Sequence, residues 1–589
     1  MIIPMIKYDF VLYNADLPAF LEKLQTLGIV DTKRSIRPID EHSTALLEEI
    51  TNYNSVFKQL SKIKIENPEP VSHAYTAEHI LKHTEKLLED KEQTTLRETK
   101  LLMEIESARP WKTWSMGSID RLSALKCTPH FYIVSEKKYK AEWEQEYPLA
   151  ILNEEKGNIY LVVLEQEGEP YHFPLNEAKL PSASIDLLEE ELRNIEQRLE
   201  HIQQEFEKYA LSKELLMSHR SELITQLDLY LAGKGTASAA EDKLAIVTAF
   251  VPEPQKQILD DFITQEQELY LCEAAKIEDN PPIKLKNNRF ARLFEPIGDM
   301  FMPPLYNELD VTAFFAPFYM LFFGFCLGDI GYGIILLLVG TLGKFFMPKM
   351  KPILSLVQFL GVGTIILPLL SGTFFGLKLG LLFNIEGVFF DDLQMFWLAI
   401  AFGGVHIIFA KLVNTFDAMF RKGFQHGLAP LGWALGLIAA ALYAGQSFLS
   451  LPIPVLWIKV SLFLGIALIL FFTSLSKNIF IRPLKALASI MDVTGIFGDL
   501  LSYIRLFGLG AAGGILGFVV NTVGGMVWNI PFIGYLFGGI VFVVGHVAVM
   551  ALSSLGALVH PMRLTFVEFY KNVGFTGGGR PYKPLTKIE

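Results

Sequence analysis

The sequence GDLLSYIRLFGLGAAGGILGFVVN occupies residues 498–521 of this 589-residue chain. Apolar and small side chains fill it, a composition typical of a helix that crosses a lipid bilayer. Arg505 lies well inside the apolar stretch 493–528, where burial of a charged side chain costs about 2.5–3.5 kcal/mol even on the mildest insertion scale. A charge kept at that cost indicates a functional site.

A structural role is the alternative for Arg505. The side chain would then reach the membrane surface, or it would pair within the chain, for example with Asp499. A helix over the 36 residues of this stretch would be about 54 Å long, against about 30 Å of hydrocarbon. It must tilt strongly or extend beyond the bilayer, so neither end is within easy reach of Arg505.

Small residues follow Arg505 along the same stretch. Gly508, Gly510, Gly513, Gly514 and Gly517 leave one side of the predicted helix almost bare. Spacing of the GxxxG type lets another helix approach closely. That neighbour is either a fixed helix of the same chain or a partner helix that moves past Arg505, and the sequence leaves both open.

Apolar stretches recur outward from this segment through the second half of the chain. They predict eight membrane spans at about 313–327, 330–346, 353–376, 395–413, 428–447, 454–472, 493–528 and 532–569. The eighth contains a second buried arginine, Arg563, in LVHPMRLTFVEF (558–569), close to His560 and Glu568. Arg563 lies nearer to the end of its span, so a structural role is a stronger alternative there.

Charge divides the chain into two halves. Residues 1–300 carry a net charge of −17, whereas residues 301–589 carry +6 and are mostly apolar. We therefore predict a soluble domain over 1–300 and a transmembrane domain over 301–589. An acidic soluble half argues against nucleic-acid binding, and three scattered Cys give neither a disulfide framework nor a metal site. Nothing in the sequence indicates catalysis, a cofactor or a metal.

The soluble half predicts small α/β lobes on a long coiled coil. Strand patterns lie at 8–13, 130–137, 158–166 and 243–254, and an amphipathic helix at 18–30. Apolar residues at heptad spacing run from Ile185 to Tyr209, in a helix of about 48 residues and roughly 70 Å that continues to Leu231. A second helix pair (46–60 and 76–107) folds back as an antiparallel hairpin. The heptads fit a spacer arm, but also a simple dimerisation coil.

Basic residues in the loops predict the orientation. They cluster between alternate spans, at Lys344, Lys349 and Lys351 and again at Arg421 and Lys422. Positive charge favours the cytoplasmic side of a membrane, and the C-terminal tail is basic too. We expect a multi-pass protein of the cell membrane with both termini in the cytoplasm and the loop 384–394 outside.

Three segments carry a resemblance to a known family. They are residues 281–333, which end in LGDIGYG, SYIRLFGLG (502–510) and VHPMRLTFVEFYKNVGFTGGGRPYKP (559–584). These segments resemble the membrane stator subunit of V-type and archaeal-type rotary ATPases, called subunit I in prokaryotes and subunit a in eukaryotes. PWKTW (110–114) is similar to a Pro-Trp-Gly segment of that family, with Lys112 in place of Gly.

The resemblance implies a mechanism. Two tilted helices would cup a rotating ring of proteolipid subunits (c or K type), and Arg505 would meet the carboxylate of each one. Arg563 would be the second arginine of the pair. Polar residues near them are expected to support the two ion half-channels: Asp499, Ser502, Tyr503, His546, Ser553, His560 and Glu568. Where the family usually has Asn after the Gly-His of the eighth span, this chain has Val549.

The resemblance also implies partners. The chain would be a non-catalytic subunit that binds peripheral-stalk heterodimers of the E/G type, a central-stalk subunit of the d/C type and membrane lipid. Two other classes compete with it. A secondary transporter predicts internal repeats with broken helices at matching positions, and no such repeat is found in the sequence. A coiled-coil membrane scaffold explains the arm but neither Arg505 nor Arg563.

Overall fold

A computed structural model of the chain describes residues 1–35, 39–63, 75–111, 116–166, 172–178, 185–241, 243–266, 268–383, 387–448, 450, 452–474, 482 and 490–587. Residues 112–114 of the PWKTW segment and 384–386 of the predicted outer loop lie outside these ranges. Contacts within the chain divide it into two compact units. The first holds Met1–Leu12, Ile29–Thr32 and Ile246–Pro584, and the second holds Tyr13–Gly28, Lys33–Ala245 and Leu585–Glu589.

A small sheet near the N-terminus belongs mainly to the first unit, with strand order β2–β7–β1–β8. Its strands are β1 (Met5–Tyr13), β2 (Asp31–Thr32), β7 (Leu244–Pro252) and β8 (Leu269–Ala274). β1 pairs antiparallel with β8, and β2 pairs antiparallel with β7. Alternate residues Tyr8, Phe10 and Leu12 of β1 are buried, as expected for a half-buried strand. The strands predicted at 8–13 and 243–254 are thereby confirmed.

One helix packs on this sheet through a partly buried hydrogen bond. The hydroxyl of Tyr8 donates to Asp260 of α8 (Lys256–Glu266) over 2.7 Å.

The N-terminal ammonium lies 2.8 Å from the buried Asp310 carboxylate, directly before the first apolar helix. Burial by itself would raise the pKa of Asp310, but hydrogen bonds from this ammonium and from Thr312 lower it below its usual value.

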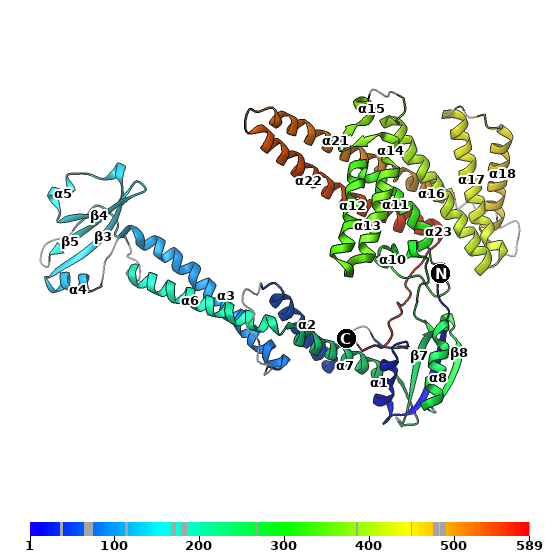
Figure 1. Cartoon of the computed structure of the whole chain (residues 1–589), viewed down its shortest axis with the longest axis horizontal. Helices are drawn as coiled ribbons and strands as arrows, with labels where there is room; N and C mark the ends of the chain where they lie inside the picture. Colours follow the sequence, from blue (N-terminus) through cyan, green and yellow to red (C-terminus); the bar gives the residue numbers. More distant parts are fainter. Residues whose placement is uncertain are drawn as a thin grey trace. The chain divides into compact units, whose positions relative to one another are not determined.

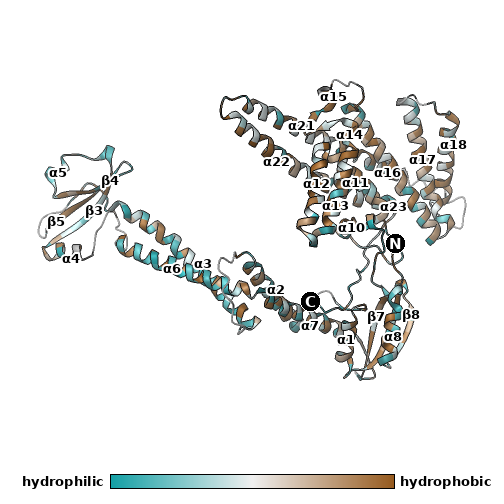
Figure 2. Ribbon diagram, in the orientation of Figure 1, coloured by the Kyte–Doolittle hydropathy of each residue, from teal (hydrophilic) through white to brown (hydrophobic). Residues whose placement is uncertain are grey.

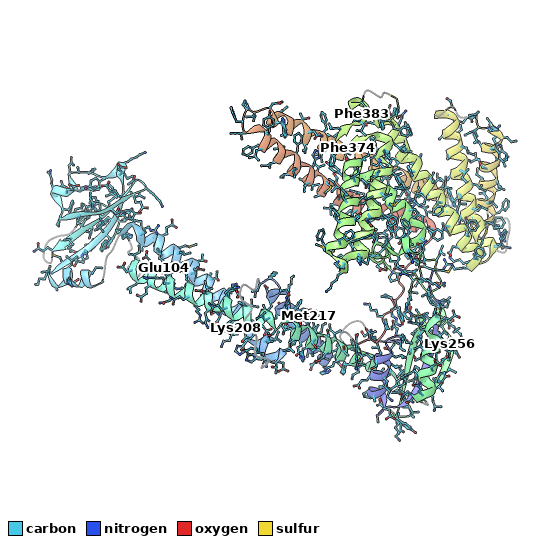
Figure 3. All side chains as sticks on the ribbon, viewed as in Figure 1. Glu104, Lys208, Met217, Lys256, Phe374 and Phe383 are labelled. Carbon is cyan, nitrogen blue, oxygen red and sulfur yellow. The ribbon has the colours of Figure 1, made fainter. Side chains whose placement is uncertain are left out.

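Helices of the second unit form an antiparallel arm. They are α1 (Leu17–Leu27), α2 (Glu41–Leu60), α3 (Ala77–Ala108), α6 (Ile185–Leu211) and α7 (Lys213–Lys234). α6 packs against α3 and α7 packs against α2, as Figure 1 shows. Hydrophilic residues dominate α3 and α6 (Figure 2), and Glu104 and Lys208 project from these two facing helices (Figure 3). The predicted long antiparallel coiled coil is confirmed, but its main helix pairs are α3 with α6 and α2 with α7, and not 46–60 with 76–107.

The prediction of one unbroken helix from Ile185 to Leu231 is wrong. Helix α6 ends at Leu211, and α7 begins at Lys213, with Ser212 outside helical geometry between them. The break falls where the helix changes its neighbour from α3 to α2. A continuous heptad seam requires one continuous partner, and here two separate helices supply it in turn.

A second small sheet lies at the far end of the arm, in the order β3–β5–β4. Its elements are β3 (Cys127–Ser135), β4 (Leu149–Glu155), β5 (Asn158–Gln166), α4 (Met116–Ala124) and α5 (Trp143–Glu146). All pairings are antiparallel. Trp111 follows α3 and packs edge-on against Phe131 and Tyr160, which ties this sheet to the end of the arm. The strands predicted at 130–137 and 158–166 are confirmed.

Apolar helices make up the rest of the first unit and are brown in Figure 2. The principal ones are α11 (Thr312–Leu327), α12 (Ile330–Phe346), α13 (Lys351–Ile366), α16 (Asp392–Arg421), α17 (Phe424–Phe448), α18 (Val455–Phe472), α20 (Ile490–Leu501), α21 (Ile504–Trp528) and α22 (Gly534–Arg563). Among the described residues, six helical stretches are long and apolar enough to cross a bilayer. α11 and α12 are apolar but shorter, so eight full crossings are not confirmed.

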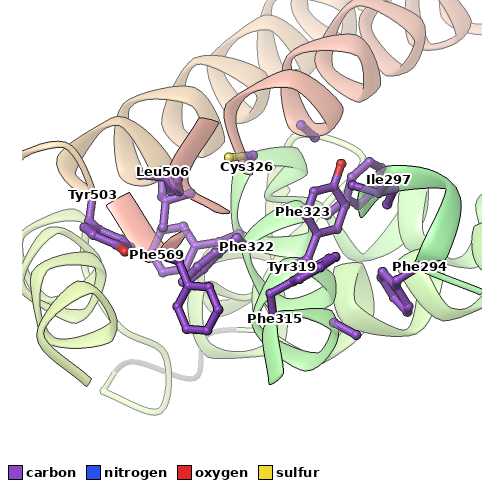
Figure 4. Close-up of a cluster of buried hydrophobic side chains, with 14 of the residues drawn as sticks. Phe294, Ile297, Phe315, Tyr319, Phe322, Phe323, Cys326, Tyr503, Leu506 and Phe569 are labelled. Atoms are coloured by element: carbon purple, nitrogen blue, oxygen red, sulfur yellow. The ribbon is translucent and has the colours of Figure 1, made fainter. Parts of the chain in front are cut away.

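Short elements connect these helices. They are α9 (Arg289–Arg292), α10 (Glu295–Asp299), α14 (Pro368–Ser371), the hairpin β9 (Thr373–Phe374) and β10 (Leu377–Lys378), α15 (Leu379–Leu382) and α23 (Tyr570–Val573). Aromatic residues fill the core between the helices: Figure 4 shows Phe315, Phe322, Tyr503 and Phe569 gathered from separate segments.

Candidate functional site

Arg505 lies in the first turn of α21, directly after an interruption of the seventh span. α20 ends at Leu501, and α21 begins at Ile504. The amide of Arg505 donates to the carbonyl of Ser502 over 3.4 Å, and the amide of Leu506 to that of Tyr503 over 3.0 Å. Such i→i−3 hydrogen bonds are those of a 3₁₀ turn, and a 3₁₀ turn inside a helix often marks a functional position. The predicted continuous stretch 493–528 therefore has a tight turn just before its arginine.

The guanidinium of Arg505 has no ionic partner within the described part of the chain. Its Nη1 is buried and makes no hydrogen bond there, and no described carboxylate oxygen lies within 4.0 Å. Arg505 is close enough to Cys326 and His560 to interact with both electrostatically. A buried arginine nitrogen without a partner is costly, because the group has lost its water and gained nothing in exchange.

Asp499 is not the partner of Arg505. Both of its carboxylate oxygens lie 3.1 Å from Nζ of Lys571, and Asn572 donates to it over 3.0 Å. The carboxylate is thereby satisfied by α23, beyond the end of the eighth span. The alternative in which Arg505 forms a structural pair with Asp499 is therefore wrong.

The small residues of α21 are packed on one face against the chain itself. A Cβ on Gly510 would lie 2.5 Å from the carbonyl oxygen of Phe325, and one on Gly517 would lie 3.0 Å from Cα of Gly376. Gly513 faces Ser553 of α22, whose Oγ would be 3.3 Å from an added Cβ. Close fixed packing thus explains these three glycines. It does not explain Gly508, which has no other atom within 4 Å of that position.

The opposite face of α21 is open. Its exposed residues share the helical spacing of Arg505 and are Gly508, Ala512, Leu516, Val519 and Val523. α22 runs beside α21 (Figure 1) and exposes a similar apolar row: Leu536, Ile540, Val544, Val547, Leu555 and Val559. A helix pair with a long unpartnered apolar surface faces lipid or another membrane protein.

The eighth span is also irregular beside its arginine. α22 ends at Arg563, contains Pro561, and passes into the π-helical segment Leu564–Phe569. Arg563 is exposed, and the described residues provide it with no ion pair within 4.0 Å. His560 lies within electrostatic reach of both Arg505 and Arg563. Single π turns in helices occur frequently at functional sites.

Glu568 lies inside the π-helical segment and is 2% exposed. Its Oε2 has no hydrogen-bond partner among the described residues. It interacts electrostatically with Asp499 and Arg563, so it belongs to the polar surroundings of the second arginine. Ser502 directs its hydroxyl to the carbonyl of Gly498 over 3.1 Å, as a helix-terminal serine commonly does.

His546 belongs to a second polar cluster, further along α22. Its two ring nitrogens lie 2.9 Å from the hydroxyl of Tyr332 and 3.0 Å from Oδ1 of Asn521. Asn521 in turn donates to the carbonyl of Phe375 over 2.6 Å. Val549, at the position where the resemblance leads us to expect Asn, is buried, and the amide beside the histidine belongs to Asn521 of α21.

A pocket of about 590 Å³ lies beside α21, and its lining includes residues of the β9–β10 hairpin. Gly510, Ala511 and Gly514 of α21 form one wall. Apolar residues make up most of the remaining lining, and Ser371, Thr373, Lys378 and Asp392 are its polar members. Lys378 and Asp392 form an ion pair over 3.1 Å.

Several polar residues of this region were not among the predicted ones. They are Asp329, Tyr332, His406, Asn521, Lys571 and Asn572. Asp329 is fully buried and accepts backbone hydrogen bonds from Gly331, Phe375 and Gly376, which fixes the β9–β10 hairpin against α12. Single polar residues inside apolar stretches, as in LGDIG and GGVHII, are the sequence signal that could have found Asp329 and His406.

The chain resembles several known proteins in sequence, although no family model matches it. It is 32% identical to the A-type ATP synthase subunit I of Pyrococcus horikoshii over 330 residues, which cover 54% of this chain and 49% of that protein. It is 26% identical to the V-type ATP synthase subunit I of Borreliella burgdorferi over 520 residues, which cover 83% and 84%. The chain thus spans about half the length of its Pyrococcus relatives.

Solved structures also match, among them the cytoplasmic N-terminal domain of subunit I, homolog of subunit a, of V-ATPase. The match covers 46% of this chain and all of that one, at 13% identity and a TM-score of 0.20.

Proposed function

Because the chain is a homologue of subunit I of the A-type and V-type ATP synthases, we propose that it is the non-catalytic stator of such a rotary complex. In this proposal the open face of α21 and α22 lies against a ring of proteolipid subunits. The membrane helices form the two ion half-channels. The arm binds peripheral-stalk heterodimers of the E/G type and resists the torque of the rotor. A central-stalk subunit of the d/C type and membrane lipid complete its contacts.

One observation carries the proposal: the unpartnered guanidinium of Arg505 on the open face of α21. The nearby carboxylate that could neutralise it, Asp499, is bound to Lys571 and Asn572. Arg505 is half-buried, with one guanidinium nitrogen fully buried, and such a charge without a partner among the described residues favours a partner on another protein. A carboxylate on a rotating ring would neutralise Arg505 for a time and would then move away as the ring turns.

Arg505 would act on that carboxylate through its charge. A guanidinium at about 4 Å favours the ionised acid, which lowers the pKa of the acid and expels its bound H⁺ or Na⁺. Arginine suits this role because it stays protonated even in a low-dielectric site and offers a planar pair of donors to a carboxylate. The ion would leave by one half-channel, and the ring would turn before the acid reloads from the other.

We assign the second arginine a supporting role. Arg563 is exposed at the end of α22, and His560 lies within reach of both arginines. Glu568 and Asp499, with Ser502 and Tyr503, would form the polar lining on this side, which we expect to face the cytoplasm because of the basic loops. Lys571 and Asn572 would hold Asp499 in place there.

The other half-channel would use the pocket beside α21. Two of its lining residues support this: Lys378 lies shortly before the loop 384–394 that we expect outside the cell, and Asp392 belongs to that loop. His546 with Asn521 and Tyr332 supplies a polar path between α12, α21 and α22, and Ser553 continues it toward Arg505 along α22. We expect the complex in the cell membrane, with both termini of this chain in the cytoplasm.

Purification of the intact complex tests the assignment. The full chain, tagged at its C-terminus and expressed in its own host, is extracted in mild detergent and its companions are identified by mass spectrometry. We expect a small proteolipid and nucleotide-binding subunits in fixed stoichiometry. Isolation of the chain alone or as a homo-oligomer, with intact arm and membrane domain, would contradict the stator assignment and favour a transporter or a scaffold.

A further inference from the structure

A buried histidine connects the two segments that carry the arginines. His406 lies in the middle of α16 and is 0% exposed. An imidazole buried in an apolar membrane helix loses the hydration of both of its nitrogens, so an apolar side chain of similar size would cost less. The contacts of His406 must therefore explain why the position holds a polar ring.

The first contact reaches the turn before Arg505. Nδ1 of His406 lies 2.8 Å from the hydroxyl of Tyr503, which is fully buried and belongs to the two-residue turn between α20 and α21. Gly403, one turn earlier on α16, lies flat against the same tyrosine ring, because an added Cβ would be 2.5 Å from its Cγ. α16 thus holds Tyr503 by a hydrogen bond and by close packing.

The second contact reaches the segment after Arg563. The imidazole stacks on the ring of Phe569, with the planes 2° apart and the centroids separated by 4.7 Å. Phe569 is the last residue of the π-helical segment that begins directly after Arg563. Phe318 and Phe322 of α11 close the other sides of the imidazole, at 4.5 and 5.0 Å. Figure 4 shows Tyr503, Phe322 and Phe569 side by side in this cluster.

These contacts place His406 between the two irregular turns of the site. The 3₁₀ turn at Ser502–Tyr503 sets the direction in which α21 starts, and the π turn sets the direction in which the chain leaves Arg563. A shift of either turn rotates the adjacent arginine, because each arginine lies within two residues of it. A displacement of about 1 Å at a reacting group lowers a rate by up to about 10²-fold.

We propose that His406 is a positioning residue for ion translocation, which fixes Arg505 through Tyr503 and aligns it with the segment of Arg563 through Phe569. The proposal rests on the stator function proposed above. His406 does not touch the transported ion or the ring. It determines how accurately Arg505 meets each ring carboxylate, so its loss allows the rotor to turn without moving an ion.

Four variants of the intact complex separate the two contacts. His406→Phe keeps the stacked ring and removes the hydrogen bond, and Tyr503→Phe removes the same bond from the other side. His406→Asn retains a polar group near the position of Nδ1 but loses the ring. His406→Gln is its matched control, because its longer amide reaches toward the position of Nε2, which makes no hydrogen bond within the described residues.

The measurement is the coupling ratio, ions pumped per ATP hydrolysed, in sealed vesicles that contain equal amounts of assembled complex. We expect His406→Phe and Tyr503→Phe each to lower the ratio roughly tenfold, within the range of a displaced reacting group. The double variant should be no worse than either single one, since both remove one bond. His406→Asn should retain more coupling than His406→Gln.

Two results are decisive against the proposal. In the first, His406→Phe and Tyr503→Phe reduce the amount of assembled complex but leave its coupling ratio unchanged, as expected for a merely structural role. In the second, the losses of coupling of the two single variants add in the double variant, as expected if they do not act through one shared bond. Arg505→Gln in the same vesicles tests the stator function separately. If Arg505→Gln pumps normally, the proposed function fails; if it does not pump while His406→Phe and Tyr503→Phe couple normally, the role of His406 alone fails.

Discussion

The two faces of α21 use small residues for different purposes. On the packed face, Gly510 and Gly517 let other backbone segments of the same chain come within contact distance. On the open face, Gly508 meets nothing within 4 Å, and Arg505 shares its register. The sequence left two explanations open for these glycines, fixed packing within the chain and a bare surface for a moving partner. In the structure each explanation applies to one face of the helix. The charge that needs an outside partner belongs to the bare surface.

The largest loss of ion pumping is expected from substitution of Arg505, the charged residue of the open face. Arg505→Gln and Arg505→Lys should lower ATP-driven ion pumping by about 10²-fold or more, the scale on which removal of one preorganised electrostatic group acts. Gln has no charge, and Lys offers a compact ammonium without the planar fork. Assembly and ATP hydrolysis by the soluble sector should persist. Pumping by Arg505→Gln at more than a tenth of the normal rate would show that the arginine is structural.

A bulky residue on the open face tests whether a protein passes there. Gly508→Leu adds side-chain atoms where the structure has open space, so the thermal stability of the complex should not change. If a ring slides over this face, pumping should fall by roughly tenfold, since overpacking of a fitted contact costs about 1–3 kcal/mol. Leu464→Phe on α18 is the matched control, because Leu464 is exposed on another apolar helix. Equal pumping by the two variants would mean that α21 faces lipid.

The second arginine should matter less than the first. Arg563 is exposed, whereas Arg505 has a buried nitrogen without a partner. Arg563→Ala should therefore lower pumping by several-fold only, in the range of a supporting charge worth about 1 kcal/mol. The comparison is made in the same vesicles at equal complex content. A loss at Arg563→Ala equal to or above that at Arg505→Ala would reverse the two roles.

The smallest effect on pumping per complex is expected on the packed face. Gly517→Ala places a methyl group 3.0 Å from Cα of Gly376 and should lower the melting temperature of the complex by a few degrees, as overpacking costs about 1–3 kcal/mol. Assembled complexes that survive should pump at the normal rate. Gly508→Ala is the matched control on the open face and should melt like the unchanged protein. Normal melting of Gly517→Ala would show that the close contact with Gly376 is loose in solution.

The sequence predicted most of the fold because period and composition determine it. Heptads indicated the arm, and alternation indicated the strands of both small sheets. The break at Ser212 escaped prediction because it depends on which helix lies opposite, and that partner is distant in sequence. The bounds predicted for two of the spans, 313–327 and 330–346, agree with α11 and α12, but at 16 and 17 residues these helices are shorter than the length that a full crossing needs.

The candidate site was predictable in its charges but not in its contacts. Arg505 and Arg563 were identifiable because each is a costly charge in an apolar stretch. The pairing of Asp499 with Lys571 joins residues 72 positions apart, and no periodic pattern reports such a contact. His406 was missed for a similar reason: a lone histidine in a helix does not reveal that it stacks on Phe569 and bonds to Tyr503.

Cross-linking tests the central claim most directly, namely that the open face of α21 lies against a moving proteolipid ring. Ala512→Cys on that face, in a chain whose three native cysteines are replaced, is paired with a cysteine one turn from the carboxylate of the proteolipid. Leu464→Cys on α18 is the control. We predict that Ala512→Cys alone forms the disulfide under mild oxidation, and that the disulfide blocks pumping until it is reduced. Absence of this cross-link, or equal cross-linking from Leu464→Cys, would contradict the account.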